Sequence, residues 1–352
     1  MRWRRLRSSW RAWRLAGRAE NADATIALTL ALRRVPPSMN LHQFRFVQEA
    51  VRRELNLTET AKALFTSQPG VSKAILELEA ELGVDIFARH GKRLRRITEP
   101  GRQVLKSIET IMREVGNLKR IGEEFSQQDA GTLSIATTHS QARYFLPEPI
   151  RQFRKRFPKV TISLHQGAPQ QVARMVLEEV AEIGLATESL AGTDELVTLP
   201  CYEWHHAVVM PSGHPLAAIE RLTLEDLAIY PLVSYHPSFS GRTRVDQAFA
   251  ARNLKPDIVL EAIDADVIKT YVKLGLGIGI LAEMAARDEP AGTELVWRPV
   301  GHLFGQNVTR MAFKRGAYLR NFVYAFAETT SERLTRALVT RAMTGPADDY
   351  QL

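Results

Sequence analysis

The sequence predicts a mainly α-helical winged helix-turn-helix domain, then a long linker helix, then an α/β domain of two lobes. Three observations predict this order. Residues 56–83 have the pattern of two short helices joined by a tight turn, and residues 98–125 keep apolar positions at alternating spacings of four and three. From residue 132 onward, short apolar strands alternate with helical segments.

The helix pair at residues 56–83 has recognisable start signals. Asn56 can cap the first helix, and Glu59 three residues later would close a capping box. After a turn, Thr66 or Ser67 starts the second helix, with Pro69 in its first turn, where a missing N–H costs little. We therefore expect a helix-turn-helix, although an ordinary amphipathic hairpin of helices fits the same pattern.

The second helix has one apolar face and one polar face. Its apolar positions recur at helical spacing and should face the core: Val71, Ile75, Leu78 and Leu82. Gln68, Ser72 and Lys73 lie on the opposite side of the first turns. In a helix-turn-helix this end meets base edges in the major groove, so these side chains are candidate base contacts.

The flanking segments complete a small domain at residues 39–97. Leu41, Phe44, Val47 and Val51 keep helical spacing and predict a supporting first helix. Five basic residues follow the second helix within eight positions: Arg89, Lys92, Arg93, Arg95 and Arg96. Gly91 permits a hairpin turn among them, so we expect a β wing whose charges face the phosphate backbone. A solvated charged loop is the alternative.

Several residues in this domain resemble the N-terminal signature of the LysR-type transcriptional regulators. The matching positions are SQPGVS at residues 67–72, Ile75, Leu78, Glu79, Leu82, Gly83, Phe87, Arg89, Thr98 and Gly101. The resemblance implies double-stranded DNA as a partner and RNA polymerase as a possible further one. The expected DNA-binding residues are Ser67, Gln68, Pro69, Ser72, Lys73, Arg89, Lys92, Arg93 and Arg95.

Composition sets limits on the class of protein. The chain has 352 residues, 45% hydrophobic and 24% charged, which is ordinary for a globular protein. Its net charge of +8 is little evidence for DNA binding, because residues 1–38 hold nine arginines against two acids. The single cysteine, Cys201, excludes an internal disulfide and suits a reducing cytoplasm. No apolar run approaches the roughly 20 residues that span a bilayer, so we expect no membrane association.

Residues 1–38 do not match the rest of the chain. They are rich in arginine and tryptophan and end in a short apolar run before Val35-Pro36-Pro37. We expect this extension to be disordered, or to reflect a translation start that belongs at Met39. A chain that begins at Met39 should then fold, oligomerise and bind DNA like the full chain.

Residues 98–128 predict a linker helix that forms dimers. Its apolar positions form a seam of about three heptads: Val104, Ile108, Ile111, Val115, Leu118, Gly122 and Phe125. One isolated helix cannot bury such a stripe, so a helix from a second subunit should cover it. Two DNA-binding domains on one dimer imply a pseudo-palindromic DNA site.

The remaining chain, residues 129–338, predicts an α/β domain. Strands are expected at residues 133–138, 160–165, 182–187, 206–210, 232–235, 258–262, 277–281 and 308–314, with helices at 141–156, 169–180, 244–252, 267–274 and near the C-terminus. The chain should leave lobe I (129–200 and 303–338) near Pro200, form lobe II (201–302), and return near residue 303. Residues 339–352 are expected to be an unstructured tail.

Residues 136–144, ATTHSQARY, place polar groups where a strand ends and a helix begins. Hydroxyls, an amide and free helix N–H groups at such a point form the usual anion site of an open α/β sheet. Plain N-capping is the alternative explanation.

Further segments resemble the CysB group of LysR-type regulators, which control sulfur assimilation: TTHSQARY, ATES, PCYEW, SFSGR and DADVIKTYVKLGLGIG. The resemblance implies an effector domain like a periplasmic binding protein, a homotetramer, and a small effector such as sulfate, thiosulfate or an acetylserine. The implied effector-binding residues are Thr138, Ser140, Gln141, Thr187, Trp204 and Ser240, two of them Ser where Thr is expected in that group.

Other motifs carry less weight. GLGIGI at residues 275–280 lacks dinucleotide-loop spacing and favours a tight turn, and Cys201 near His205 and His206 lacks a third metal ligand at ligand spacing. We therefore expect no cofactor, no metal and no enzymatic activity. A LysR-type regulator of another pathway, or an α/β enzyme or solute-binding domain with an appended helix-turn-helix, stays open as an alternative.

Overall fold

The computed structural model describes residues 39–91, 93–126, 130–187, 190, 194–288 and 294–345, without the side chain of Ser240. The chain folds as two compact units that divide within one helix, between Glu114 and Val115. The predicted extension at residues 1–38 and the end of the predicted tail lie outside the described residues.

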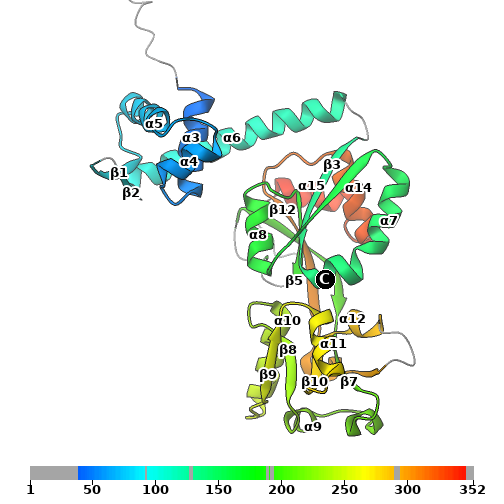
Figure 1. Cartoon of the computed structure of the whole chain (residues 1–352). Helices are drawn as coiled ribbons and strands as arrows, with labels where there is room; N and C mark the ends of the chain where they lie inside the picture. The colour runs from blue at the N-terminus through cyan, green and yellow to red at the C-terminus, as the bar shows by residue number, and fades with distance from the viewer. Residues whose placement is uncertain are drawn as a thin grey trace, which may run out of the picture. The chain divides into compact units, whose positions relative to one another are not determined.

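The first unit contains the predicted helix-turn-helix. Helices α3 (Leu41–Arg52), α4 (Leu57–Ala63) and α5 (Gln68–Leu82) pack around a shared core (Figure 1). Val71, Ile75 and Leu78 are fully buried, as the spacing predicted. Leu41, expected in the core, is exposed, and Ala50 is buried instead.

The helix starts differ slightly from the predicted chemistry. The Asn56 side chain caps α4 by accepting from the N–H groups of Thr58 and Glu59, but the Glu59 carboxylate accepts from Lys62 at 2.8 Å. The reciprocal capping box forms one helix earlier, between Asn40 and Gln43. At α4 the ion pair between Glu59 and Lys62 therefore takes the place of the expected hydrogen bond from the Asn56 N–H to the Glu59 side chain.

The predicted wing is present as an antiparallel hairpin. Strands β1 (Phe87–His90) and β2 (Arg93–Ile97) pair from Phe87 opposite Ile97 to His90 opposite Arg93. Gly91 has φ +61° at the turn, a left-handed conformation that glycine adopts without strain. The wing follows α5, which ends at Leu82 and is capped by Gly83.

Helix α6 (Glu99–Ser126) confirms the long linker helix. Its first half packs on the helix-turn-helix core through Leu105 and Ile108. Ile111, Leu118 and Phe125, seven residues apart, stay exposed in the single chain. The predicted seam thus exists as an exposed stripe, and its covering helix remains a prediction.

The second half of α6 also has a polar face that the apolar pattern did not predict. Asn117 donates to the Gly316 carbonyl at 2.9 Å and accepts from the Tyr318 N–H at 2.7 Å. The Glu124 carboxylate accepts from the Asn321 N–H at 2.7 Å. These bonds tie residues 117–124 to the α/β domain within the second unit.

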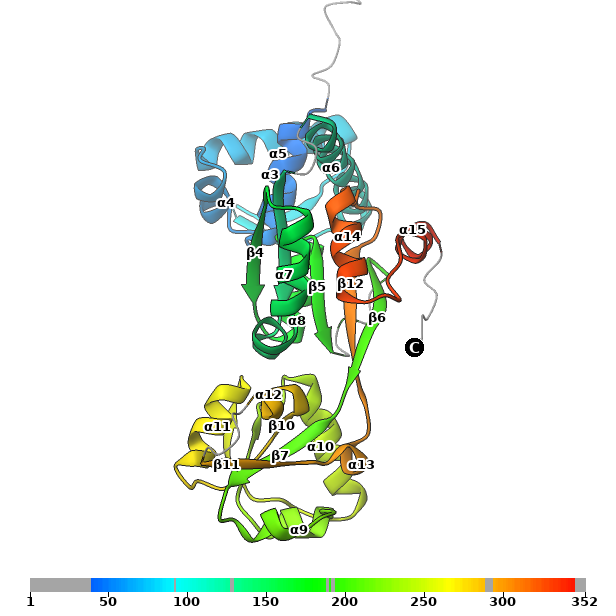
Figure 2. The same cartoon turned by 90° about the vertical axis from the view of Figure 1, so that its right-hand side faces the viewer.

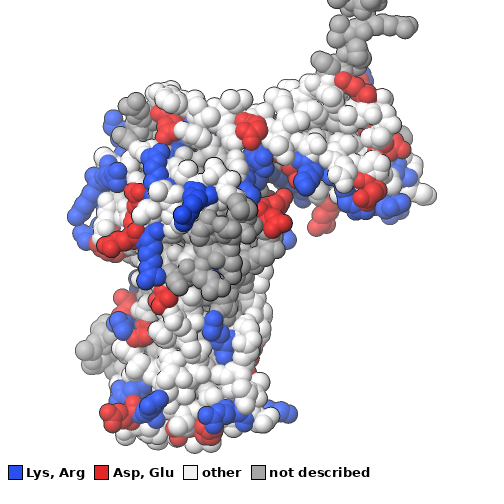
Figure 3. Space-filling view, turned by 180° about the vertical axis from the view of Figure 1, so that it is seen from behind, with Lys and Arg blue, Asp and Glu red and all other residues white. Residues whose placement is uncertain are grey.

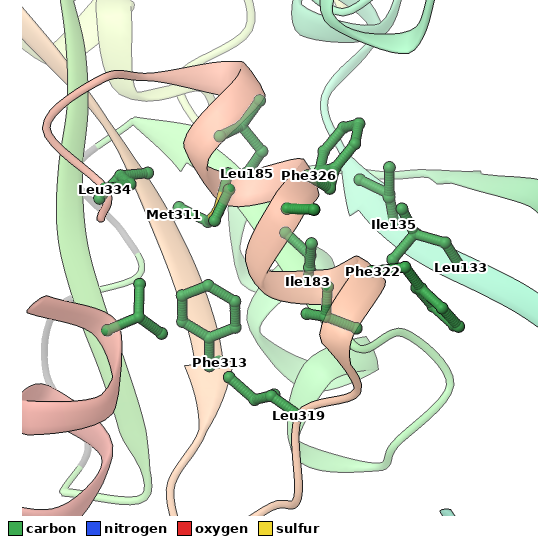
Figure 4. Close-up of a cluster of buried hydrophobic side chains, with 14 of the residues drawn as sticks. Leu133, Ile135, Ile183, Leu185, Met311, Phe313, Leu319, Phe322, Phe326 and Leu334 are labelled. Atoms are coloured by element: carbon green, nitrogen blue, oxygen red, sulfur yellow. The ribbon is translucent and has the colours of Figure 1, made fainter. Parts of the chain in front are cut away.

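Lobe I is a five-stranded sheet between two helical layers. Its strand order is β4 (Val160–Gln166), β3 (Gly131–Thr137), β5 (Ile183–Thr187), β12 (Asn307–Lys314) and β6 (Leu196–Trp204). Helices α7 (Pro147–Arg156) and α14 (Asn321–Thr330) cover one face, and α8 (Pro169–Leu177) covers the other. Figure 4 shows the buried core, where side chains of β3, β5 and β12 meet α14.

Lobe II repeats this architecture with order β11 (Leu295–Pro299), β7 (His206–Pro211), β10 (Ile278–Ala282), β8 (Leu232–Tyr235) and β9 (Ile258–Ala262). One face packs on α11 (Ala265–Lys273) and α12 (Glu283–Arg287). The other face packs on α9 (Leu224–Ala228), α10 (Ser240–Ala251) and α13 (Gly301–Phe304), and a 3₁₀ turn, Pro215–Ala218, lies beside it.

The chain passes from lobe I to lobe II between β6 and β7 and returns between α13 and β12, as can be followed in Figure 2. Strand β6 stays in the lobe I sheet to Trp204, and β7 enters the lobe II sheet at His206. The chain returns between Phe304 and Asn307. The crossings were predicted near Pro200 and residue 303, so the outward crossing lies later than predicted, because β6 was not recognised as a lobe I strand.

Two further predictions of secondary structure need correction. The single helix expected at residues 141–156 is a π-helical turn, Gln141–Phe145, followed by α7, which begins at Pro147 because proline favours a first helical position. The C-terminal region holds two helices, and α15 (Arg336–Thr344) buries Val339 and Ala342 in lobe I. The expected tail therefore belongs to the core as far as α15 extends.

Among the described residues, no helix is both long enough and apolar enough to cross a membrane.

Candidate DNA-binding and effector-binding sites

The N-terminal end of α5 presents the predicted base-contacting residues. Ser67 caps the helix by accepting from the Gly70 N–H at 3.3 Å, and Pro69 is exposed in the first turn. The Lys73 side chain is 77% exposed, 3.7 Å from Glu77, while Gln68 and Ser72 are half-buried. The buried face of α5 fixes the direction of these polar groups, so they form one surface.

The wing divides its arginines between two roles. Arg93 and Arg95 are exposed on β2. Arg89, predicted as a phosphate contact, instead reaches the buried Glu79 at 2.8 Å, and Glu79 also accepts from the N–H groups of Ile86 and Phe87. Arg89 therefore has a structural partner in Glu79, and its contact with a phosphate stays a prediction. Lys92 lies outside the described residues.

Charge is mixed on the one face of the α/β domain that Figure 3 shows. Figure 3 shows basic and acidic side chains interspersed over the visible face of the α/β domain. A continuous basic surface is therefore absent from that view, and the local basic residues of the wing remain the electrostatic signal for DNA.

A small cavity of about 30 Å³ lies between the lobes. Its lining includes five of the six predicted effector-binding residues: Thr138, Ser140, Gln141, Thr187 and Trp204. They lie at the ends of β3, β5 and β6 or in the π-helical turn. Lobe II lines the same cavity with Tyr235, Phe239, Gly241 and Ala282. The parallel strands β3 and β5 end at the same edge of the sheet, which brings residues 138 and 187 together.

Hydrogen bonds organise the lobe I side of this cavity. The Trp204 indole N–H donates to the Thr187 hydroxyl at 3.2 Å, and that hydroxyl lies 3.3 Å from the hydroxyl of Thr309. The Gln141 amide donates to Thr309 at 3.4 Å, while the Tyr202 hydroxyl donates to the Gln141 carbonyl oxygen. The indole N–H of Trp204, one of the implied effector-binding residues, is thus used within the protein.

Lobe II supplies a buried tyrosine that the sequence analysis missed. The Tyr235 hydroxyl lies 3.5 Å from the Ser140 hydroxyl and accepts from the Ala282 N–H at 3.4 Å. Burial raises the pKa of Tyr235, so it remains a neutral hydroxyl that can donate. Tyr235 and Thr309 lie far in sequence from the motif at residues 136–144, and only the fold brings them to it.

Two expected features of the cavity differ from the structure. Ser240 begins α10, but its side chain lies outside the described residues, so its predicted contact stays a prediction. The long helix expected to direct its N–H groups at an anion is a five-residue π-helical turn at this point. Hydroxyl and amide side chains of lobe I therefore line the cavity, and lobe II adds the first turn of α10 at Gly241.

Comparison with known proteins identifies both parts of the chain. Residues 41–102 match the family of bacterial regulatory helix-turn-helix proteins, lysR family, and residues 126–335 match the LysR substrate binding domain. The chain belongs to the LysR family. This LysR-family transcriptional regulator is 59% identical over 315 residues to the HTH-type transcriptional regulator CysB of Burkholderia cenocepacia, covering 89% of this chain and 100% of CysB.

Two further comparisons agree. The transcriptional regulator SsuR of Burkholderia cenocepacia is 52% identical over 299 residues, covering 85% of this chain and 97% of SsuR. The crystal structure of the cofactor-binding domain of the Cbl transcriptional regulator aligns with TM-score 0.59 and 44% identity, covering 62% of this chain and 96% of that one. The LysR-family fold of two α/β lobes behind a helix-turn-helix is therefore established for this regulator.

The thiol of Cys201 is a poor nucleophile in this regulator. Cys201 is 3% exposed, and burial raises the pKa of its thiol to about 12. The thiolate is the reactive form, so Cys201 is inert near neutral pH. His206, fully buried, has its pKa lowered to about 4 by burial and by nearby Arg244 and His205.

Proposed function

We propose that this regulator controls sulfur-assimilation genes, for cysteine or sulfonate metabolism, in response to a sulfur oxyanion or acetylserine-type effector. The effector would bind in the cavity between the lobes, at Thr138, Ser140, Gln141, Thr187, Trp204 and Ser240. The neighbouring Tyr235 would add a donor from lobe II. The similarity to CysB and SsuR supports the pathway, since both exceed half identity over nearly their whole length.

The chemistry of the cavity carries this proposal. Its polar lining residues are hydroxyl, amide and indole groups, and no lysine or arginine is among the described residues that line it. Neutral donors suit a fully ionised oxyanion, whereas a protonated phosphate would bring a donor that needs its own acceptor. Donors from both lobes also let a ligand shift the balance between lobe arrangements, as signalling requires.

DNA binding would use two groups of residues in the helix-turn-helix domain. Ser67, Gln68, Pro69, Ser72 and Lys73 would meet base edges, while Arg93, Arg95 and Lys92 would contact phosphates. The exposed stripe of Ile111, Leu118 and Phe125 would pair with a second subunit, in a dimer or tetramer on a pseudo-palindromic site. RNA polymerase is a further proposed partner, and the cytoplasm the proposed compartment.

Calorimetry tests the effector assignment directly. Sulfate, thiosulfate, O-acetylserine and N-acetylserine are titrated into the wild type and into Ser140→Ala and Trp204→Ala, with Ser163→Ala on β4 as a matched control. We expect at least one ligand to bind. Its affinity should fall about tenfold or more in Ser140→Ala, because a hydrogen bond to a charged group contributes about 1.5–3 kcal/mol. It should also fall in Trp204→Ala, which removes a ring that lines the cavity and the hydrogen bond from that ring to Thr187.

Two results would defeat the sulfur assignment: no binding of any of the four ligands, or binding unchanged in both cavity variants. A LysR-family regulator of another pathway would then be the better proposal. Recovery of chemically unchanged ligand after long incubation checks the further proposal that the protein holds its ligand without converting it, and measurable turnover would contradict that proposal.

A further inference from the structure

A second contact joins the lobes beside the cavity and outside its lining. Asp266, near the start of α11 in lobe II, accepts from the Tyr144 hydroxyl of lobe I at 2.5 Å. Its other carboxylate oxygen lies 3.3 Å from the Nε2 atom of His139, also in lobe I. One half-buried carboxylate therefore holds two side chains of the opposite lobe.

The lobe I side of this contact belongs to the segment that forms the cavity. Ser140 and Gln141, which line the cavity, lie between His139 and Tyr144 in the chain. The π-helical turn of Gln141–Phe145 carries Gln141 and Tyr144 together. Whatever fixes His139 and Tyr144 against lobe II therefore also fixes the position of the donors at Ser140 and Gln141.

The two cross-lobe contacts differ in character. Inside the cavity, the hydroxyls of Ser140 and Tyr235 are 3.5 Å apart, at the outer limit of a hydrogen bond. The bond from Tyr144 to Asp266 is short and has an ionised acceptor, and such bonds are about twice as strong as neutral ones. The contact outside the cavity is thus the firmer of the two without any ligand.

Positively charged groups complete this network. The Lys269 ammonium lies 3.3 Å from Asp266, donates to the Ala285 carbonyl, and sits 5.1 Å from the centre of the Tyr144 ring. Arg143 lies 3.9 Å from Asp266. His139, Asp264 and Asp266 offer atoms within 4.8 Å of one another, but these cations already balance the carboxylates, so we assign no metal there.

We propose that Asp266 is a positioning residue of the regulator: by holding Tyr144 and His139 from the opposite lobe, it keeps the lobes close to the ligand-binding arrangement before any effector arrives. Asp266 itself is absent from the cavity lining. Asp266 would raise the fraction of molecules whose lobes are in the ligand-binding arrangement. The apparent affinity for the effector decreases in proportion as that fraction decreases. This role goes beyond the proposed function, and only its affinity readout rests on that function.

The test combines a distance measurement with an affinity measurement on the full chain. Asp266→Asn and Tyr144→Phe remove the charge or the donor with little change in shape, and Glu225→Gln, on an exposed pair within lobe II, is the matched control. Spin labels on Lys155→Cys in lobe I and Lys255→Cys in lobe II report the lobe separation by pulsed electron paramagnetic resonance, with labelled chains diluted in unlabelled ones.

We expect a single narrow distance distribution in the ligand-free wild type and control. The Asp266 and Tyr144 variants should both broaden it or shift it to longer distances and lower effector affinity about three- to tenfold, and the double variant should be no worse than the worse single one. Distributions identical to the wild type in both variants would overturn the proposal. If no effector binds the wild type, the sulfur assignment fails, while the distance measurement still decides the role of Asp266.

Discussion

Single buried polar residues place the functional surfaces of this regulator. Glu79, 4% exposed, accepts from two backbone N–H groups at the start of the wing and from Arg89. His206 lies where the chain crosses into lobe II, with its ring 5.1 Å from the Trp204 ring and its Nδ1 atom 3.3 Å from the Asn307 amide nitrogen. Both residues are structural, yet each neighbours a proposed binding surface.

Replacing Glu79 should destabilise the helix-turn-helix domain. Glu79→Ala leaves two buried N–H groups and the Arg89 guanidinium without their partner, and breaking a buried pair in this way costs about 3–5 kcal/mol. Glu79→Gln keeps one acceptor oxygen and should cost less. Thermal unfolding, together with hydrogen exchange of the amides in β1 and β2, measures this loss of stability. An Ala variant as stable as the wild type would contradict the assigned role.

His206 should make the α/β domain sensitive to acid. Burial lowers the pKa of His206 to about 4, against an ordinary value near 6.5, so the unfolded chain takes up a proton first as the pH falls. The contribution of His206 to folding stability is complete above pH 6.5 and is lost as the pH falls toward 4. The loss is about 3 kcal/mol, because each unit of pKa shift corresponds to about 1.36 kcal/mol.

Denaturant unfolding of the wild type and His206→Asn at pH 4.5, 5.5, 6.5 and 7.5 measures this difference. The wild type should lose more stability than the variant between pH 6.5 and 4.5. Parallel losses in the two proteins would show that other groups cause the acid sensitivity.

At the scale of elements, strands with dense β-branched or alternating residues were predictable, and β8 and β9 have the predicted bounds. Strand β6 was not predicted, because Pro200 interrupts its pattern, and the structure shows a register shift opposite that residue. The motif at residues 136–144 located the part of the cavity lined by Thr138, Ser140 and Gln141. Its partners Tyr235 and Thr309 depend on contacts between segments more than 90 residues apart, which no local pattern encodes.

Helix α5 and the wing should affect DNA binding in different ways. Replacing Gln68, Ser72 or Lys73 by Ala should relax sequence preference at a cost of about 1–3 kcal/mol for each hydrogen-bonded pairing with a base that the substitution removes. Arg93→Ala or Arg95→Ala should instead weaken binding to every sequence and reduce its salt dependence.

Titrations of each variant on specific and scrambled duplexes at several salt concentrations separate these effects. Arg89→Ala serves as a contrast, since this substitution should act through the stability of the wing. Unchanged discrimination in all three α5 variants would remove the assignment of that helix to base recognition.

At the scale of the whole molecule, the regulator combines a DNA-binding unit, a helix with an exposed apolar stripe, and a two-lobed domain with a polar cavity. The polar face of α6 binds residues 316–321, which follow β12, the strand that carries Thr309. A change at the cavity therefore has a short covalent and hydrogen-bonded route to the linker helix. The proposed role of this regulator is the control of sulfur genes by a sulfur ligand.

Genome-wide DNA occupancy of the regulator, measured in cells under sulfur limitation and in sulfur-replete cells, tests that claim most directly. We expect occupied sites upstream of genes for sulfate, sulfonate or cysteine metabolism, with occupancy or footprint length that changes between the two conditions. In cells carrying Ser140→Ala the same sites should stay bound but no longer show that change. Occupancy confined to genes of other pathways, or identical under both conditions, would contradict the account.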